Sequence, residues 1–465
     1  MLKLRRFPLF LYQNWQQFRQ RSANHQIFSA AIVVAIATLV VKLGGMLKEL
    51  VVAWRFGTGD DLDAFLIALV IPSFLVNVIA GSFSYVLVPS YIQVREQQGA
   101  IAAQKLLSGA SLWSFGLLLL TTIIMLITAP LYLPLLAAGF SLAKLHLTYQ
   151  LLYAIAPMVL FSGILTVWAA VLNAGERFAL AALTPLSTSA AIVLLLFGFQ
   201  AWGVFALAGG LVLGTFLEGL LLGWALYRQG LTPIPRWYGM NEALAQIMRQ
   251  YAPTIAGSML MCSANLVDQA MAAMLLPGSV AALNYGNRIV ALPLGLVTTA
   301  LGTAVAPYLA KMVAQNNWRG AQHTFNHYLK LIFAVTVPCM VGLIWLSEPI
   351  IRSLFQRGSF SAADTQIVSQ IQIAFALQIP FYIASVFTVR LVSALQINHL
   401  LMWGSAINLT ANILFNYLFS KVIGIAGIAL STSGVYFISF LFLWIMTQKH
   451  LTRYIQMGQA PTSTH

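Results

Sequence analysis

Twelve long apolar stretches run through the sequence and constrain its fold more than any other feature. They lie near residues 27–56, 62–93, 105–129, 148–173, 177–199, 203–227, 249–276, 279–312, 325–347, 364–395, 399–419 and 424–447. Each approaches or exceeds the roughly 20 residues that cross about 30 Å of hydrocarbon as a helix. Only 8% of the residues are charged, against about a quarter in soluble domains. A β-barrel would show ten-residue alternation instead. We therefore predict an all-α, polytopic membrane protein with about twelve transmembrane helices.

The distribution of basic residues predicts how the chain lies in the membrane. The 25 Lys and Arg outnumber the 11 Asp and Glu, which in a soluble protein could indicate nucleic-acid binding but here must be read against the spans. Sixteen bases fall on segments on the side of the amino terminus. Five fall on the opposite side, at Arg55, Lys144, Arg352, Arg357 and Lys421. By the positive-inside rule we expect both termini in the cytoplasm and no nucleic-acid partner.

An internal duplication divides the chain into two halves. An offset of 221 to 223 residues superposes Gly57 on Gly278, Pro72 on Pro293, Gly81 on Gly302, Pro157 on Pro380, Leu172 on Leu395 and Gly203 on Gly424. We therefore expect a basic cytoplasmic segment (1–26), a six-helix lobe (27–227), a cytoplasmic linker (228–248), a second six-helix lobe (249–447) and a cytoplasmic tail (448–465). Such pseudo-symmetric parallel repeats are typical of transporters, with a central site between the lobes.

Four basic residues interrupt the apolar spans, namely Lys42, Lys48, Arg288 and Arg390. Each costs about 3 kcal/mol near the bilayer centre on insertion scales, so such groups usually face an interior cavity or a partner. Structural pairing with an acid such as Glu49 is the alternative, although Lys48 and Glu49 are neighbours on a helix and are expected to point in different directions. Arginine forks and lysine point charges favour phosphate or diphosphate, while leaving a carboxylate ligand open.

A second set of polar residues could bind a cation. Asp268, Asn408, Asn412 and Thr432 lie within the seventh, eleventh and twelfth spans, and the two asparagines are four residues apart on one helical face. Their oxygens suit a hard cation, but asparagine in membrane helices also forms interhelical hydrogen bonds, so both interpretations stay open.

Other motifs narrow the function. The acidic run from Asp60 to Asp63 is most simply a solvated turn, and Ser361 with Asp364 indicates a helix start. The sequence has no Walker A loop, no HExxH and no GxSxG, which leaves no visible ATPase, metalloprotease or serine hydrolase.

Several segments resemble one family. They are WRFGTGDDLDAFLIALVIPSF (54–74), FSYVLVPSY (83–91), LNYGNRIVALPLGLVTTALGTAVAPYLAK (283–311), LFQRGSFSAADT (354–365) and GIAGIALSTS (424–433). They are similar to the MurJ/MviN-like lipid II flippases of the multidrug/oligosaccharidyl-lipid/polysaccharide exporter superfamily. The resemblance implies a bacterial cytoplasmic membrane protein of peptidoglycan biosynthesis. It would work by alternating access around a cationic cavity and carry a polyprenyl-diphosphate-linked glycan whose tail stays among the membrane lipids.

The resemblance also implies site residues. The family's essential bases match Lys42, Lys48 and Arg288, and its acid between the first two helices matches Asp63. Its sodium site matches Asp268, Asn408, Asn412, the carbonyl of Ile428, and Thr432. We expect no other cofactor than this Na⁺ as a possible coupling ion. This chain differs where family members carry an arginine pair on the second helix, because Val76 and Asn77 stand there, and Asn412 replaces an acid.

We therefore expect a transporter rather than an enzyme, a flippase of a lipid II-like precursor that needs no ATPase subunit. Moving two negative charges outward across 100 mV is favoured by up to about 4.6 kcal/mol. One alternative is an exporter of another polyprenyl-linked oligosaccharide. The others are a cation-coupled drug exporter and a membrane-embedded transferase with Asp63 or Glu218 as its base.

Overall fold

The computed structural model describes residues 23–174, 178–232, 236–240 and 242–457, which form helices joined by short loops. The predicted all-α class is confirmed for this part of the chain. The predictions for residues 1–22 and 458–465 lie outside the described residues. Most of the side chains in the described spans are apolar on every face, and a helix satisfies its own backbone hydrogen bonds, as a lipid environment requires.

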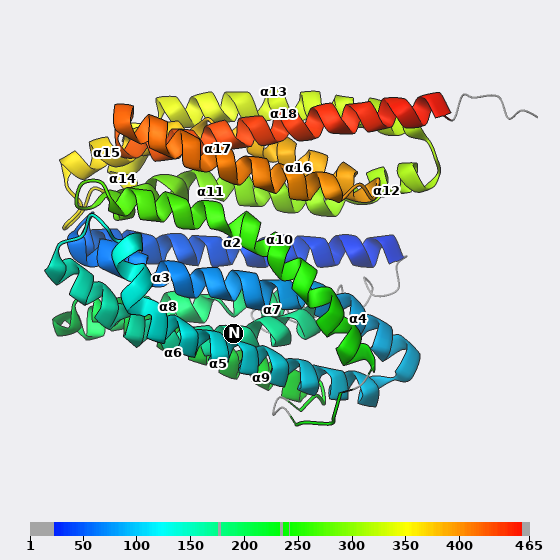
Figure 1. The fold of residues 1–465 in the computed structure, drawn as a ribbon, viewed down its shortest axis with the longest axis horizontal. Helices are drawn as coiled ribbons and strands as arrows, with labels where there is room; N and C mark the ends of the chain where they lie inside the picture. The colour runs from blue at the N-terminus through cyan, green and yellow to red at the C-terminus, as the bar shows by residue number, and fades with distance from the viewer. Residues whose placement is uncertain (1–22, 175–177, 233–235, 241, 458–465) are drawn as a thin grey trace, which may run out of the picture.

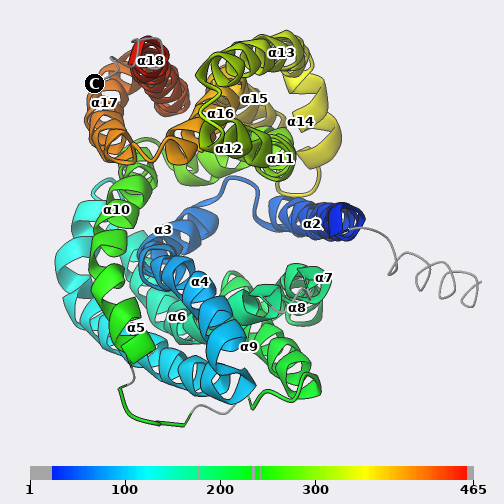
Figure 2. The same ribbon diagram turned by 90° about the vertical axis from the view of Figure 1, so that its right-hand side faces the viewer.

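Two helical bundles lie side by side along the long axis of the molecule (Figures 1 and 2). The first contains α2 (Ala23–Phe56), α3 (Asp60–Leu75), the π-helix η1 (Val76–Gly81), α4 (Ser82–Gln98), α5 (Ala100–Leu136), α6 (Leu142–Ala174), α7 (Phe178–Leu183), α8 (Leu186–Gly198), the 3₁₀ turn η2 (Gln200–Trp202) and α9 (Phe205–Arg228). The second contains α10 (Glu242–Ala273), α11 (Ser279–Ala304), α12 (Ala306–Ala314), α13 (Trp318–Trp345), α14 (Ser347–Phe355), α15 (Ala362–Ala376), α16 (Ile379–Ala394), α17 (His399–Ile423) and α18 (Ile425–Met457).

The predicted spans agree with the observed helices. Among the described residues, nine helical stretches are long and apolar enough to cross a membrane. The three other predicted windows fall on α2, α10 and α17, which have 34, 32 and 25 residues. The predicted helix start at Ser361 is confirmed, because Ser361 and Asp364 form a capping box at α15. The multi-pass membrane architecture is therefore confirmed.

Two long helices, α2 and α10, lie between the bundles (Figure 2). The first half of α10 packs on the first bundle, where the Tyr251 hydroxyl donates to the Ile79 carbonyl over 2.8 Å. That carbonyl belongs to η1, the π-helical segment that follows Pro72. The Ser82 hydroxyl also bonds Ser258 at 2.7 Å. The second half of α10 packs on α17, so α10 physically connects the two bundles.

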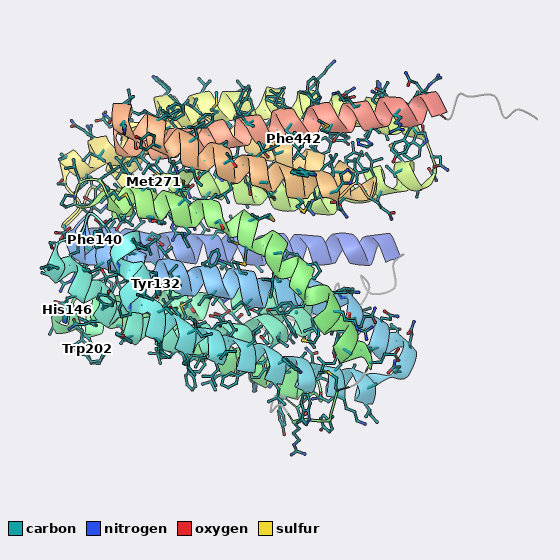
Figure 3. All side chains as sticks on the ribbon, viewed as in Figure 1. Tyr132, Phe140, His146, Trp202, Met271 and Phe442 are labelled. Carbon is teal, nitrogen blue, oxygen red and sulfur yellow. The ribbon has the colours of Figure 1, made fainter. Side chains whose placement is uncertain are left out.

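One end of the molecule ties the bundles together, and we call it the closed end. It comprises the loops at 57–59, 139–141, 274–278 and 356–361, which touch across the bundles. It lies on the left of Figure 1, and Figure 3 labels Phe140, His146 and Trp202 at the same end. The opposite end carries the connection from α9 to α10, where the Ser108 hydroxyl donates to the Arg236 carbonyl at 2.9 Å.

Candidate substrate-translocation site

The helices α2 and α11 bring three of the predicted bases together. Lys48 Nζ and Arg288 Nη2 each lie 2.8 Å from Oε1 of Glu49. Nearer the start of α2, the end of the Lys42 side chain packs over Gly295, where an added Cβ would lie 2.8 Å from its Nζ. Position 42 thus faces 295 while 48 and 49 face 288, so the two helices run antiparallel. We call Lys42, Lys48, Glu49 and Arg288 the basic strip.

The charges of the basic strip suit an anion. Glu49 is buried, whereas the side chains of Lys48 and Arg288 keep 23% and 49% of their surface exposed. Three bases outnumber one acid, so the strip keeps a net positive charge. Lys42 and Lys48 are separated by about 9 Å along the helix, at 1.5 Å per residue. Glu49 therefore holds two of the bases in place without neutralising the strip.

The expectation that Lys48 and Glu49 point apart is wrong. Their side chains form an ion pair although they are sequence neighbours. The lysine side chain is long and flexible enough to reach around the helix, and the shared contact with Arg288 fixes the position of the carboxylate. The alternative of structural pairing is thus realised in part, at Glu49.

Arg390 is not brought to the basic strip by any contact of the described residues. It lies in the last turns of α16, is exposed, and forms no ion pair or hydrogen bond within the described part of the chain. Its assignment as a substrate contact stays a prediction.

Asp63 lies at the closed end, where it joins the two bundles. Only 1% of its surface is exposed. Its Oδ2 accepts hydrogen bonds from Lys144 Nζ at 2.8 Å and from the Gly278 amide at 2.7 Å, and its Oδ1 accepts from the Ala281 amide at 2.8 Å. A carboxylate at the first turn of a helix is stabilised by free amides and by the helix dipole. Asp63 of the first bundle therefore caps α11 of the second.

The interpretation of Asp60 to Asp63 as a solvated turn is accordingly wrong for Asp63. Lys144, only 8% exposed, pairs with both Asp60 and Asp63, and its ammonium lies 4.1 Å from the centre of the Phe140 ring. The family-derived role of Asp63 in substrate binding stays a prediction, because both of its oxygens are occupied in this conformation.

Close backbone approaches complete the closed end. The Ser359 amide donates to the Trp54 carbonyl at 2.9 Å, and the Thr58 hydroxyl donates to Asp364. Gly57 and Gly278 have φ values of 55° and 84°, and an added Cβ would lie within 2.4 Å of the Ser359 oxygen and 2.2 Å of the Thr58 oxygen, respectively. Glycine is required at both positions, since the left-handed backbone and the close contact each exclude a side chain.

Most of the predicted cation ligands gather around Asp268. Its Oδ1 accepts hydrogen bonds from Asn412 at 2.9 Å and Asn416 at 2.6 Å, and its Oδ2 accepts from the Thr432 hydroxyl at 3.3 Å. That hydroxyl is also 3.2 Å from the Ile428 carbonyl. No basic side chain of the described residues pairs with this carboxylate. A carboxylate surrounded only by amide, hydroxyl and carbonyl groups is a plausible ligand for an alkali cation.

Asn408 is one turn further along α17. It donates to Ser439 at 3.1 Å rather than to Asp268, and its Oδ1 is buried without a partner among the described residues. The Asn416 Oδ1 is orphaned in the same way. The nitrogen and oxygen of an amide are assigned from the hydrogen-bond network. Rotating these amides would turn oxygens toward a cation, so the residues present fit one.

Three residues of the site were not predicted as such. Asn416 extends the series Asn408, Asn412 by another four residues, and this spacing on one helical face could have indicated it. Glu49 was considered only as a neutralising acid. Lys144 was counted for orientation alone, and no sequence pattern connects it to Asp63 across 81 residues.

Two pseudo-symmetric membrane-spanning bundles, joined at one end and sharing a basic strip between α2 and α11, define a transporter of the two-lobed type. The family model for the lipid II flippase MurJ matches residues 52–461. The chain belongs to this family of transporters.

Individual relatives agree with this membership. The chain is 27% identical to the probable lipid II flippase MurJ of Synechocystis over 444 residues, covering 92% of this chain and 83% of the relative. It is 27% identical to the lipid II flippase MurJ of Thermosipho africanus over 419 residues, covering 90% and 85%. A solved lipid II flippase MurJ in an inward closed conformation superposes with a TM-score of 0.76 at 26% identity, covering 91% of this chain and 90% of that one. An inward-facing multidrug transporter of the MATE family shares the fold, with a TM-score of 0.78 at 13% identity, covering 92% and 100%.

Proposed function

We propose that this protein moves a lipid II-like precursor, a polyprenyl-diphosphate-linked glycan, from the inner to the outer leaflet of the bacterial cytoplasmic membrane. The observation that carries the proposal is the basic strip, which offers exposed cationic groups from both bundles at their interface. Charged groups inside a membrane protein are retained where they line a pathway. The lysines supply point charges, and Arg288 supplies a planar fork that matches phosphate oxygens.

The mechanism follows from where the contacts lie. The diphosphate binds along the basic strip, and the polyprenyl tail remains in the lipid. We place the closed end outside and both termini inside, since Arg55 and Lys144, bases of the side with fewer charges, lie at the closed end. In this conformation the Asp63 contacts keep the bundles together on the outer side. Outward opening requires these contacts to break while the helices stay folded.

The rival functions fit the side chains less well. A cation-coupled drug exporter would need a net negative cavity, whereas the basic strip is positive. A transferase would need a free base near the substrate, but the oxygens of Asp63 are occupied. Glu218 accepts hydrogen bonds from Thr184 and Thr188 between α8 and α9.

Transport in purified vesicles tests the proposal. Full-length protein is reconstituted with a fluorescent lipid II, and a membrane-impermeant quencher reports the leaflet that carries the label. We expect the protected label to reach the outer surface at a rate that rises with the protein-to-lipid ratio. A rate equal to that of protein-free vesicles would contradict the proposal.

We further propose that Na⁺ binds at Asp268, with Asn412, Asn416, Thr432 and the Ile428 carbonyl as its neighbours. The support is an unpaired carboxylate among oxygen-bearing groups with orphaned amide oxygens. A bound cation would supply the positive charge that Asp268 lacks, and would hold α10 against α17 and α18.

Replacing Asp268 by Ala is expected to abolish stabilisation by Na⁺. For the unmodified protein in detergent, a Na⁺ concentration of 100 times Kd should add about 2.7 kcal/mol to the free energy of unfolding. The check is thermal unfolding in NaCl against choline chloride at equal ionic strength. The Asn265→Ala variant, one turn away on α10, is the control and should keep the effect. Equal stabilisation of the Asp268 variant would contradict the site.

A further inference from the structure

A second feature of the transport pathway is a cavity of about 490 Å³ inside the second bundle, lined by α10, α11, α17, α18 and the α15–α16 region. Its volume falls within the roughly 300–1,000 Å³ of small-ligand sites. Gly295 of α11 lines this cavity and is also the residue over which Lys42 packs. The cavity therefore adjoins the basic strip.

The lining is rich in uncharged polar groups. Seven amide side chains contribute to it, and we call it the amide cavity. No basic side chain is among its described lining residues, and its one acid, Asp268, already accepts three hydrogen bonds. An anionic group would find no counter-charge there. A neutral ligand with many hydrogen-bonding groups would find both donors and acceptors.

Several of these polar groups have no partner within the protein. Gln378, at the junction of α15 and α16, is 3% exposed, and its side-chain amide forms no hydrogen bond with the described residues. Asn287, next to Arg288, likewise lines the cavity without a side-chain hydrogen bond in the described part of the chain. A buried polar group without a partner costs about 1–3 kcal/mol. Such a group facing a cavity is therefore a candidate ligand contact.

The cavity also has an aromatic wall. Tyr382 of α16 and Tyr436 of α18 pack edge to face with their ring centres 4.8 Å apart, and both line the cavity. Tyrosine combines an apolar ring with a polar hydroxyl. Amides that match adjacent hydroxyls, together with a ring that covers a C–H face, are the complement of a sugar.

We infer that the amide cavity binds the neutral glycan directly attached to the diphosphate, while the diphosphate lies on the basic strip. This inference rests on the proposed function, since it assigns the second part of the same substrate. The adjacency of Asn287 and Arg288 places the two kinds of contact side by side on α11.

Binding of two probes separates the cavity from the strip. Full-length protein in nanodiscs is titrated with undecaprenyl diphosphate, which has no sugar, and with lipid II. The test variants are Gln378→Met, of similar size and without the amide, and Tyr382→Phe, which removes only a hydroxyl. For each we expect the Kd for lipid II to rise about tenfold, the effect of one lost hydrogen bond, and the Kd for undecaprenyl diphosphate to change less than twofold. Gln366→Met, on the exposed surface of α15, is the matched control and should change neither.

Each other outcome overturns the inference in an identifiable way. If unmodified protein binds both probes equally tightly, the diphosphate function stands and the glycan subsite is refuted. If the variants weaken both probes equally, the cavity residues support the fold rather than recognise sugar. If the variants bind lipid II like unmodified protein, the cavity does not hold the glycan. If unmodified protein binds neither probe, the proposed function itself fails, and the inference with it.

Discussion

Replacing Arg288 by Ala is expected to lower the rate of lipid II transport by about 10- to 150-fold, with the protein still folded and inserted. The reason is the loss of a charged, fork-shaped donor to the diphosphate, since hydrogen bonds to charged groups contribute about 1.5–3 kcal/mol. Arg288→Lys keeps the charge and loses the fork, so an intermediate rate is expected. The measurement is the vesicle assay with each variant at matched protein density. Arg352→Ala, an exposed arginine paired with Glu348, is the control and should transport normally.

A double variant distinguishes substrate binding from structural pairing. If Arg288 only neutralised Glu49, then Glu49→Gln combined with Arg288→Ala would leave no unpaired charge at this point, and transport would return. We expect no recovery, because the contact with diphosphate is still missing. Recovery to more than half of the normal rate would show that the ion pair with Glu49 is the whole role of Arg288.

The architecture could be predicted from the sequence because it depends on averages over many residues. The length and apolarity of the spans predicted the helices, and repeated glycine and proline positions predicted two halves. Resemblance added the family. The prediction that Lys42, Lys48 and Arg288 serve one site agrees with the antiparallel contact of α2 and α11, although their contact with substrate stays a prediction.

The contacts between individual side chains could not be predicted in the same way. Helical geometry assigns Lys48 and Glu49 to different faces, but it does not include the reach of a lysine side chain or the presence of Arg288. Likewise, an acidic run at a loop is usually solvated. Asp63 is buried because Lys144 and the first turn of α11 come from distant parts of the chain. Such three-dimensional coincidences leave no local pattern.

Replacing Asp63 by Ala is expected to open the closed end. The change leaves Lys144, 8% exposed, with only Asp60 as an ion-pair partner, and removes the acceptor of two amides at the start of α11. Removing one partner of a buried ion pair costs about 3–5 kcal/mol, which corresponds to a shift of more than about 100-fold in a two-state equilibrium. Asp63→Asn keeps one acceptor oxygen and should have a smaller effect.

Distances between spin labels measure this shift directly. Labels at Ala138 of the first bundle and Ala362 of the second report the separation of the closed end, in a background without Cys262 and Cys339. Asp61→Ala is the control, since Asp61 is exposed two residues away and forms no ion pair within the described residues. We expect a longer distance to dominate only in the Asp63 variants. An unchanged distance distribution would mean that the backbone contacts of Gly57, Gly278 and Ser359 hold the bundles together without the carboxylate. The barrier to outward opening would then lie in these close approaches rather than in the capping of α11.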